Sequence, residues 1–586
     1  MNSTTSWHKS GSASALPGAL SDLIDRVIRR TRLWRSEKRD VRAELESHFR
    51  EGLDELAMEG LPLDASVRVL AESFGNPDLA ATLIRRGKRR GRPMIWKLAF
   101  TATMALLGLM AAGGGYVAYL TLASPNPTVD YLKQLNESAE ETTEEQRAWT
   151  LLQKSLLKLT PVPQTLSLLN PLEIRPQSPE WPSVREWVEL NRPLLPEFHE
   201  AAHRPHYGFI YGGPDTAVFM RRLAELQNDE AMLQKLADSP DPLVPKLISI
   251  LLPHLAEMQK AAWFLVLDAR DHVSSQNFFD AIASLDVCHR LGAKLFEGET
   301  LIEQLVGIKL MRMSCEELRQ IVTWHGTILD NATKASIASG HVFTMPEREF
   351  VPHLDGERLS FHDAVQYLFT DDGQGNGRLI PSQFAKIRDF GTVAPAETST
   401  LNSLNQDAEM VALAARHADR LETLEKYDEL WDEMARYREL PLYDPQRRQT
   451  GVILQRFADD PETKVRFAVL DILIPNLMYA DQVIREAAME NAATRSVVQI
   501  ARFRADRGTW PQSWDALVPG YLTTAPIDVF TGDPLVFAID KAGNPRVYSV
   551  GRNQKDDGGS LAPIPDSGRG DRTTPADLIY FNAPSK

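Results

Sequence analysis

Three residues in the middle of the chain have the types and spacing of a zinc-peptidase site. The run HEAAH at residues 199–203 fits the pattern H-E-x-x-H, which places two histidines on one face of a helix as metal ligands. The glutamate between them activates a metal-bound water for peptide hydrolysis. A third ligand is needed, and Glu225 or Glu230 lies downstream at a plausible distance. This alternative uses His199 and His203 as ligands and Glu200 as the catalytic base.

The residues around this motif favour a different interpretation. Helices that carry a zinc motif are apolar around it, whereas Glu197 and Arg204 flank this one. Pro196 precedes the motif by three residues and Pro205 follows it by two. Prolines at these positions limit the helix to little more than two turns. An ordinary helix end at the surface is therefore the competing interpretation.

A glycine-rich loop further along resembles the first half of a calcium loop of the EF-hand type. Residues 372–379 place oxygen ligands at alternate positions, and the candidate ligands are Asp372 and Asn376. Two positions depart from that pattern. Gln374 replaces an acid, and Gln383 stands where the bidentate glutamate belongs. The alternative is a glycine-rich hairpin or loop without metal.

One segment has the length and composition of a membrane span. No charged residue occurs from Leu98 to Val129, and about 20 apolar residues in a helix cross the hydrocarbon core. Basic residues bunch before this segment, and acids dominate after it. Because cationic flanks stay on the cytoplasmic side, we predict a transmembrane helix over 96–122 with a cytoplasmic N-terminus and an extracytoplasmic C-terminal domain. The basic flank consists of Arg85, Arg86, Lys88, Arg89, Arg90, Arg92 and Lys97.

Composition excludes several classes of function. The chain has 586 residues with a net charge of −14, which argues against a nucleic-acid partner. It contains no glycine-rich phosphate loop, no nucleophile elbow and no Cys/His cluster. Its two cysteines, Cys288 and Cys315, are expected on successive helices at heights too different for a disulfide. We predict that both are reduced and buried.

The apolar pattern predicts a mainly α fold in five parts. Residues 1–20 form a disordered tail, and 21–92 form a cytoplasmic head of four short helices. After the span, 124–500 form a large domain of helical hairpins, and 501–586 form a small α+β unit with an antiparallel sheet. A charged helix over Gln406–Tyr437 is expected to face solvent. Other predicted elements are helices over Trp149–Leu159, Thr216–Ala237, Pro245–Asp268, Asn277–Leu291, Thr300–Val322 and Ile484–Phe503, and extended runs over Leu535–Ile539 and Arg546–Val550.

The predicted head carries the features of a known module. These are VRAELESHF at 41–49, Gly60, and ESFGNP at 72–77. The pattern resembles the small helical prefix domain found ahead of membrane spans in bacterial permease-type and signalling proteins. The resemblance covers roughly residues 21–90, and it implies protein interaction or regulation rather than catalysis.

The C-terminal part resembles the globular domain of the type II secretion major pseudopilin. The resemblance covers 501–586 and rests on three pieces in order. They are Gly508–Pro511 after a helix, Pro526–Asp528 followed by Gly532–Leu535, and Tyr548–Gly551 before an Asp/Gly-rich loop. In that family the membrane helix begins the chain, whereas this module lies at the opposite end. Assembly into a fibre through that helix is therefore not implied.

The same resemblance implies a metal. The family's terminal loop holds calcium, and here Asp556, Asp557 and Asp577 offer carboxylates on either side of a loop. A bare acidic turn is the alternative. No cofactor is certain, and calcium is the candidate.

These observations lead to one hypothesis and one rival. The first is a single-pass protein of the bacterial inner membrane, without an enzymatic site, that binds protein partners on both sides of the membrane. The rival is a membrane-anchored zinc metallopeptidase that uses the motif at 199–203. A sensor that passes a signal across the span would share the topology of the first.

Overall fold

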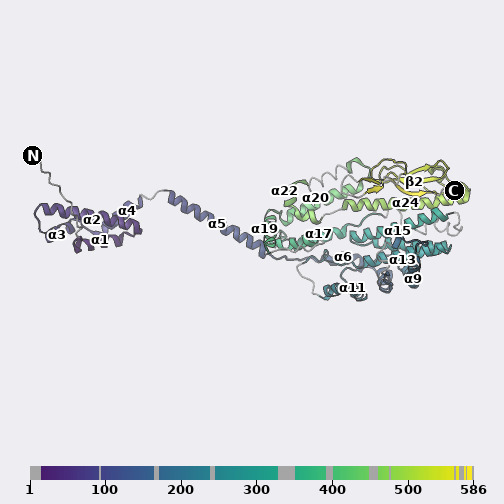
Figure 1. Ribbon diagram of the computed structural model, residues 1–586, viewed down its shortest axis with the longest axis horizontal. Helices are drawn as coiled ribbons and strands as arrows, with labels where there is room; N and C mark the ends of the chain where they lie inside the picture. The colour runs from purple at the N-terminus through teal and green to yellow at the C-terminus, as the bar shows by residue number, and fades with distance from the viewer. Residues whose placement is uncertain are drawn as a thin grey trace, which may run out of the picture. The chain divides into compact units, whose positions relative to one another are not determined.

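The computed structural model describes residues 15–90, 94–163, 171–237, 244–326, 343, 350–390, 400–447, 459–473, 477–559, 563–565, 573–575 and 577–583. It confirms a mainly helical chain with a small antiparallel sheet near the C-terminus (Figure 1). The chain divides into two compact units, Met1–Tyr116 and Val117–Lys586. Most of the predicted N-terminal tail lies outside the described residues.

The smaller unit packs short helices around a core of branched aliphatic side chains. Leu20, Ile24 and Ile28 recur every four residues on the first helix, and they pack against Phe49 of the second. Gly60 follows the second helix with a φ of 84°, a left-handed conformation that suits glycine at a helix end. The helices are α1 (Gly18–Thr31), α2 (Arg35–Met58), α3 (Leu63–Ser73) and α4 (Pro77–Arg90).

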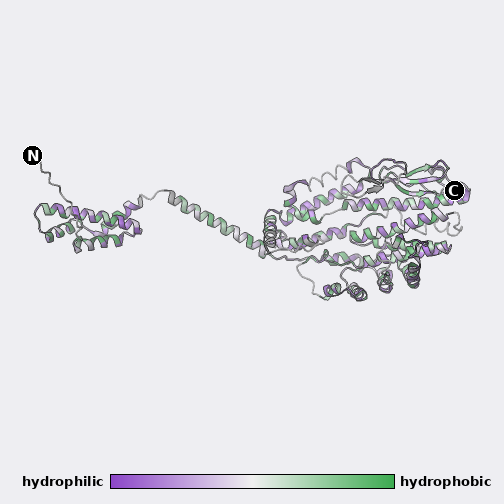
Figure 2. Ribbon diagram, in the orientation of Figure 1, coloured by the Kyte–Doolittle hydropathy of each residue, from purple (hydrophilic) through white to green (hydrophobic). Residues whose placement is uncertain are grey.

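A long apolar helix, α5 (Met94–Leu122), follows α4, and its residues up to Tyr116 belong to the smaller unit. Its segment Leu98–Leu122 is long and apolar enough to cross a membrane, and none of its most apolar window is buried. Figure 2 shows this segment with few strongly hydrophilic positions. One residue near its end differs, because Leu120 is fully buried within the larger unit.

The larger unit is built on four long helices that pack in succession, α13 on α14, α14 on α15 and α15 on α24 (Figure 1). They contribute a large share of the main hydrophobic core, to which α7, α9, α10 and α11 also contribute. The helices of this unit are α6 (Tyr131–Glu140), α7 (Trp149–Lys158), α9 (Trp181–Asn191), α10 (Leu195–His203), α11 (Pro214–Gln227), α12 (Glu230–Ala237), α13 (His254–Ser274), α14 (Phe278–Phe296), α15 (Leu301–His325), α17 (Asp355–Leu368), α18 (Pro381–Phe390), α19 (Thr400–Arg416), α20 (Arg420–Glu439), α22 (Pro461–Arg466), α23 (Ala468–Leu473) and α24 (Leu477–Arg507).

Two glycines allow the backbones of α14 and α15 to meet. A Cβ added at Gly292 would lie 2.7 Å from the carbonyl oxygen of Gly307, and one added at Gly307 would lie 2.5 Å from that of Gly292. Real Cβ atoms do not approach so closely. The pair therefore fixes the crossing of these helices. Thr300 caps α15 and shares a capping box with Glu303.

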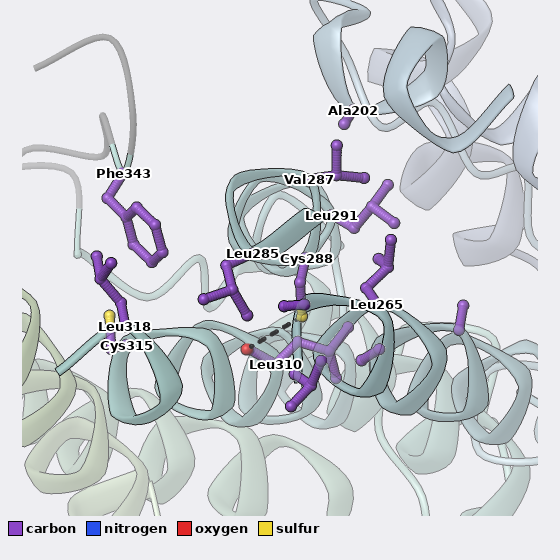
Figure 3. Packing of buried hydrophobic residues seen from close by; sticks show 14 of the residues in the cluster. Ala202, Leu265, Leu285, Val287, Cys288, Leu291, Leu310, Cys315, Leu318 and Phe343 are labelled. Carbon is purple, nitrogen blue, oxygen red and sulfur yellow. Dashed lines mark hydrogen bonds between the residues drawn. The ribbon is translucent and has the colours of Figure 1, made fainter. Parts of the chain in front are cut away.

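Both cysteines are reduced and buried in this core, which confirms the prediction. Cys288 of α14 lies among Leu285, Leu291 and Leu310, with its thiol 3.7 Å from the Leu310 carbonyl oxygen (Figure 3). Burial raises the pKa of the Cys315 thiol to about 12. Neither thiol is therefore ionised at neutral pH.

The predicted sheet is present at the C-terminus. Strands β1 (Val536–Ile539), β2 (Pro545–Ser549) and β5 (Leu578–Asn582) form an antiparallel sheet in the order β1-β2-β5. A register shift falls at Val547/Tyr548 in the pairing with β5. Strands β3 (Pro563–Pro565) and β4 (Thr573–Pro575) form a separate pair. Phe581 and Val547 belong to the main core, so the sheet packs onto the helices.

Three predicted helices differ from the structure at their boundaries. The predicted helix over 216–237 is two helices, because Asn228 adopts a left-handed φ of 53° and ends α11. The segment predicted from Pro245 begins only at His254, after Pro253. The segment 406–437 is divided between α19 and α20, and α20 buries Thr423, Tyr427, Leu430 and Met434 on one face.

Candidate functional site

The zinc-like motif lies on α10, a helix of nine residues that begins with Pro196 in its first turn. Phe198, Ala201 and Ala202 face the core, which leaves the polar residues of the motif at the surface. After His203 the backbone turns to an extended conformation at Arg204. The helix is as short as its flanking prolines predict.

The two histidines of the motif share one face of α10. Their ring centroids are 4.3 Å apart, and Nδ1 of His203 lies 2.8 Å from the carbonyl oxygen of His199. Partial burial, together with the neighbouring charge of His203, lowers the pKa of His199. The pair therefore has the helical spacing that a two-histidine site requires.

The glutamate of the motif and the candidate third ligand are each paired with an arginine. Glu200 accepts a hydrogen bond from Arg204 at 2.6 Å, and Glu225 accepts one from Arg222 at 2.8 Å on α11. Within the part of the chain that the structure describes, no three His, Cys, Asp or Glu side chains converge as a metal ion requires. The structure thus brings His199 and His203 together without a third ligand.

A cavity of about 630 Å³ adjoins this helix, and the sequence did not single it out. His203 and Arg204 line one side, and His289, Arg290 and Lys294 of α14 line the other. His353 also lines it. The cavity is rich in nitrogen-bearing side chains, which are hydrogen-bond donors to anionic or polar groups.

The two cationic side chains of α14 that line this cavity are each paired with an acidic side chain. Arg290 donates to Asp286 at 2.7 Å, and Lys294 donates to Glu297 at 2.6 Å. Burial lowers the pKa of His289 to about 4, so this ring is neutral at physiological pH. The arrangement offers donors to a polar group, and His289 itself is not suited to proton transfer, which needs a group poised near neutral pH.

A buried polar cluster lies behind the same region. Glu303 is fully buried and accepts a hydrogen bond from the hydroxyl of Tyr211, and His254 Nε2 lies 3.3 Å from Glu303 Oε1. Trp149 and Phe209 cover His254 with ring contacts of 5.3 Å and 4.2 Å. These contacts join the segment after α10 to the start of α15.

The glycine-rich loop with Asp372 and Asn376 closes on itself through backbone donors. The Asp372 carboxylate accepts hydrogen bonds from the N–H groups of Gln374 and Asn376, at 2.8 Å and 3.1 Å. The Asn376 side-chain oxygen accepts from Gly377 and Leu421. Oδ1 of Asp372 and the side-chain oxygen of Asn376 therefore accept from N–H groups as in an Asx-type turn.

The three candidate carboxylates near the C-terminus also accept hydrogen bonds from neighbouring groups. Asp577 is 1% exposed, and its oxygens accept from the N–H groups of Asp557 and Gly559 at 3.4 Å and 2.8 Å. Asp556 accepts from the Tyr548 hydroxyl, and Asp557 accepts from the Asn553 amide. Each carboxylate therefore has a donor partner, and among the described residues no three His, Cys, Asp or Glu side chains are grouped as for a metal ion.

No protein-family model, no curated protein and no solved structure matches this chain.

Proposed function

We propose that this chain is a single-pass protein of the bacterial inner membrane that holds a large helical domain against the outer face of the lipid bilayer for binding to other proteins. The N-terminus is cytoplasmic, and the larger unit is extracytoplasmic. The protein acts in interaction, assembly or regulation and not as an enzyme.

The observation that carries this proposal is the composition and placement of α5. A segment of 25 residues, Leu98–Leu122, contains no charge, and a water-exposed helix of that kind would leave a large apolar surface unsatisfied. The cationic residues before it and the acidic residues after it give the two ends opposite electrostatic character. That asymmetry supports a cytoplasmic N-terminus.

The end of α5 is part of the larger unit rather than a free tether. Leu120 packs among Phe361, Leu368 and Phe369, and the Tyr119 hydroxyl lies 3.2 Å from Oγ1 of Thr370. The chain beyond α5 is then fixed by Gln366, whose side chain pairs with the backbone of Thr128 and Val129. These contacts make the end of α5, from Val117 on, and the segment after it part of the larger unit.

The resemblances of the two ends agree with a role in interaction. The helices α1–α4 support the four-helix prefix-like head, for which the family role is protein interaction or regulation. The sheet β1-β2-β5 supports a pseudopilin-like unit, carried by the hairpins of the larger unit. We propose that each end presents a protein-binding surface on its own side of the membrane.

Topology is tested by cysteine labelling in intact cells and spheroplasts. Both native thiols are buried, so background labelling is low. Single cysteines are introduced at exposed positions, Ser47→Cys in the smaller unit and Glu230→Cys in the larger. A membrane-impermeant maleimide should label the Glu230→Cys variant in spheroplasts and the Ser47→Cys variant only after lysis. The opposite pattern, or extraction of the chain by alkaline carbonate, would overturn the proposal.

The rival peptidase is tested by metal content. The purified full-length protein, dialysed against metal-free buffer, should contain no stoichiometric zinc, because His199 and His203 lack a third ligand. One zinc per chain that is lost in the His203→Ala variant would make the peptidase the better proposal. The matched control is His206→Ala, an exposed histidine three residues away.

A further inference from the structure

A second cavity, of about 580 Å³, lies at the end of the central helices and away from the motif at 199–203. It is bounded by the turn at 175–177, the end of α13, the start of α14 and the end of α15. Nothing in the proposed function assigns it a role.

Two arginines share one carboxylate at the floor of this cavity. Arg270 is 5% exposed and donates twice to Glu317, at 2.9 Å and 2.6 Å, and also to the carbonyls of Leu172 and Ile174. Arg175 reaches the same carboxylate at 3.4 Å with a side chain that is 41% exposed. Among the described residues, Glu317 is the only acid that lines the cavity. Among the lining side chains, two guanidinium groups therefore face one carboxylate, and Arg175 is the more exposed of the two.

The walls are rich in neutral groups that both donate and accept hydrogen bonds. Three glutamine amides and one serine hydroxyl line the cavity, and this is the mixed donor and acceptor set that pairs with sugar hydroxyls. Within the described part of the chain, the Gln320 amide makes a 3.4 Å contact with Glu316. The neutral polar residues are Gln177, Ser274, Gln276 and Gln320.

An aromatic ring lies at the rim. Trp324 lines the cavity and is 67% exposed, although an indole of this size is seldom left in water without a partner. Phe278 and His325 contact each other behind it, with ring centroids 5.3 Å apart. A flat, exposed ring beside hydroxyl-matching groups suits the CH face of a sugar ring.

From the two guanidinium groups, the amide-lined walls and the exposed indole, we propose that this cavity binds a sugar that bears a carboxylate. The carboxylate pairs with Arg175, the ring packs on Trp324, and the hydroxyls meet the glutamine amides. A small inorganic anion would leave the indole and the amides without contacts. A neutral sugar would leave Arg175 without its ligand.

The test uses glucuronate as the probe and the full-length protein in detergent micelles. Saturation-transfer NMR and calorimetry should detect glucuronate binding to the wild type. Glucose and acetate, which carry the ring alone and the carboxylate alone, should each bind at least about tenfold more weakly, because each lacks one of the two main contacts. Trp324→Ala and Arg175→Gln should each weaken glucuronate binding by a similar factor.

Matched controls distinguish this site from a general effect. Phe279→Ala removes an aromatic side chain that is 58% exposed on the same end of α14 but outside the cavity, and Arg222→Gln removes an exposed arginine elsewhere. Both should bind glucuronate like the wild type. Absence of glucuronate binding at millimolar concentration, equal binding of glucose, or equal losses in the two controls would each overturn the proposal.

Discussion

At the scale of single residues, burial sets the protonation of two histidines in the larger unit. His289 Nε2 donates to the side-chain oxygen of Asn491 and its ring contacts Phe343, and His417 lies between the Ala418 carbonyl and the Val469 N–H. Desolvation lowers the pKa of each ring to about 4. Both are therefore neutral in the folded protein at pH 7.

These two histidines should make the larger unit less stable in mild acid. Since the folded pKa lies below the unfolded value of about 6.5, the unfolded chain binds more protons, and stability is lost as pH falls from about 6.5 towards 4. Each histidine contributes a slope of at most about 1.4 kcal/mol per pH unit. Denaturant unfolding between pH 7.5 and 4.5 measures it. The His289→Asn variant should show a shallower slope, and the exposed His206→Asn variant should keep that of the wild type.

Asp577 is expected to act in folding rather than in metal binding. Replacing it with alanine leaves the buried N–H of Gly559 without an acceptor, which should cost about 1–3 kcal/mol in the free energy of unfolding. Asp557→Ala removes an exposed carboxylate and should change stability by less than about 0.5 kcal/mol. Addition of a calcium chelator should leave the melting temperature unchanged. A clear drop with chelator would instead indicate a calcium-stapled loop.

Only the local spacing of residues in the candidate site could be predicted from the sequence. The i, i+4 relation of His199 and His203 follows from the sequence alone, because helix geometry is local. Their missing third ligand depends on how α11 packs, and the cavity depends on α14 coming alongside α10. Neither the packing of α11 nor the position of α14 beside α10 leaves a pattern in the neighbouring sequence. Arg175, Glu317 and Trp324 are likewise distant in sequence and meet only in the folded chain.

At the scale of elements, the crossing of α14 and α15 should tolerate no side chain at its glycines. Gly292→Ala or Gly307→Ala would place a methyl group against the opposite backbone, and separating the helices should cost about 1–3 kcal/mol or more. Thermal unfolding of the larger unit measures this cost. Gly520→Ala, where an added Cβ meets nothing within 4 Å, is the matched control and should leave the melting temperature nearly unchanged.

A second element-scale prediction concerns the end of α5. Leu120→Ala should open a cavity beside Phe361 and destabilise the larger unit by about 2–5 kcal/mol. Leu109→Ala lies on the same helix but is 71% exposed to the surroundings, so the larger unit should be unaffected. Unfolding in detergent, followed by a probe in the larger unit, measures both. Equal effects of the two variants would contradict the assignment of the end of α5 to the core of the larger unit.

The positions of helices could be predicted where apolar residues recur at helical spacing without interruption. The residues at which helices begin and end could not. The stretches that became α7, α14 and α15 carry continuous amphipathic patterns with caps such as Thr300. The errors fall where backbone conformation decides, at the left-handed Asn228 and after Pro253. The burial of Tyr427 also escaped prediction, since its stacking on Phe361 at 3.6 Å joins helices far apart in the chain.

At the scale of the whole molecule, the two units should unfold separately. Each has its own hydrophobic core, so calorimetry of the full-length protein should resolve two transitions. Ile24→Ala, at a position 1% exposed in the smaller unit, should lower the temperature of only the smaller transition. A single transition that shifts as a whole would show that the units are coupled.

The packing of Leu120 and the hydrogen bonds of Gln366 make the end of the proposed span part of the larger unit. An apolar helix that is too long for a thinner bilayer accommodates by tilting. Because the last turn of α5 belongs to the larger unit, such a tilt would act first on the contacts that this turn makes there. The packing of Leu120 on Phe361 and the contact of Tyr119 with Thr370 would then depend on the thickness of the lipid in which the protein resides.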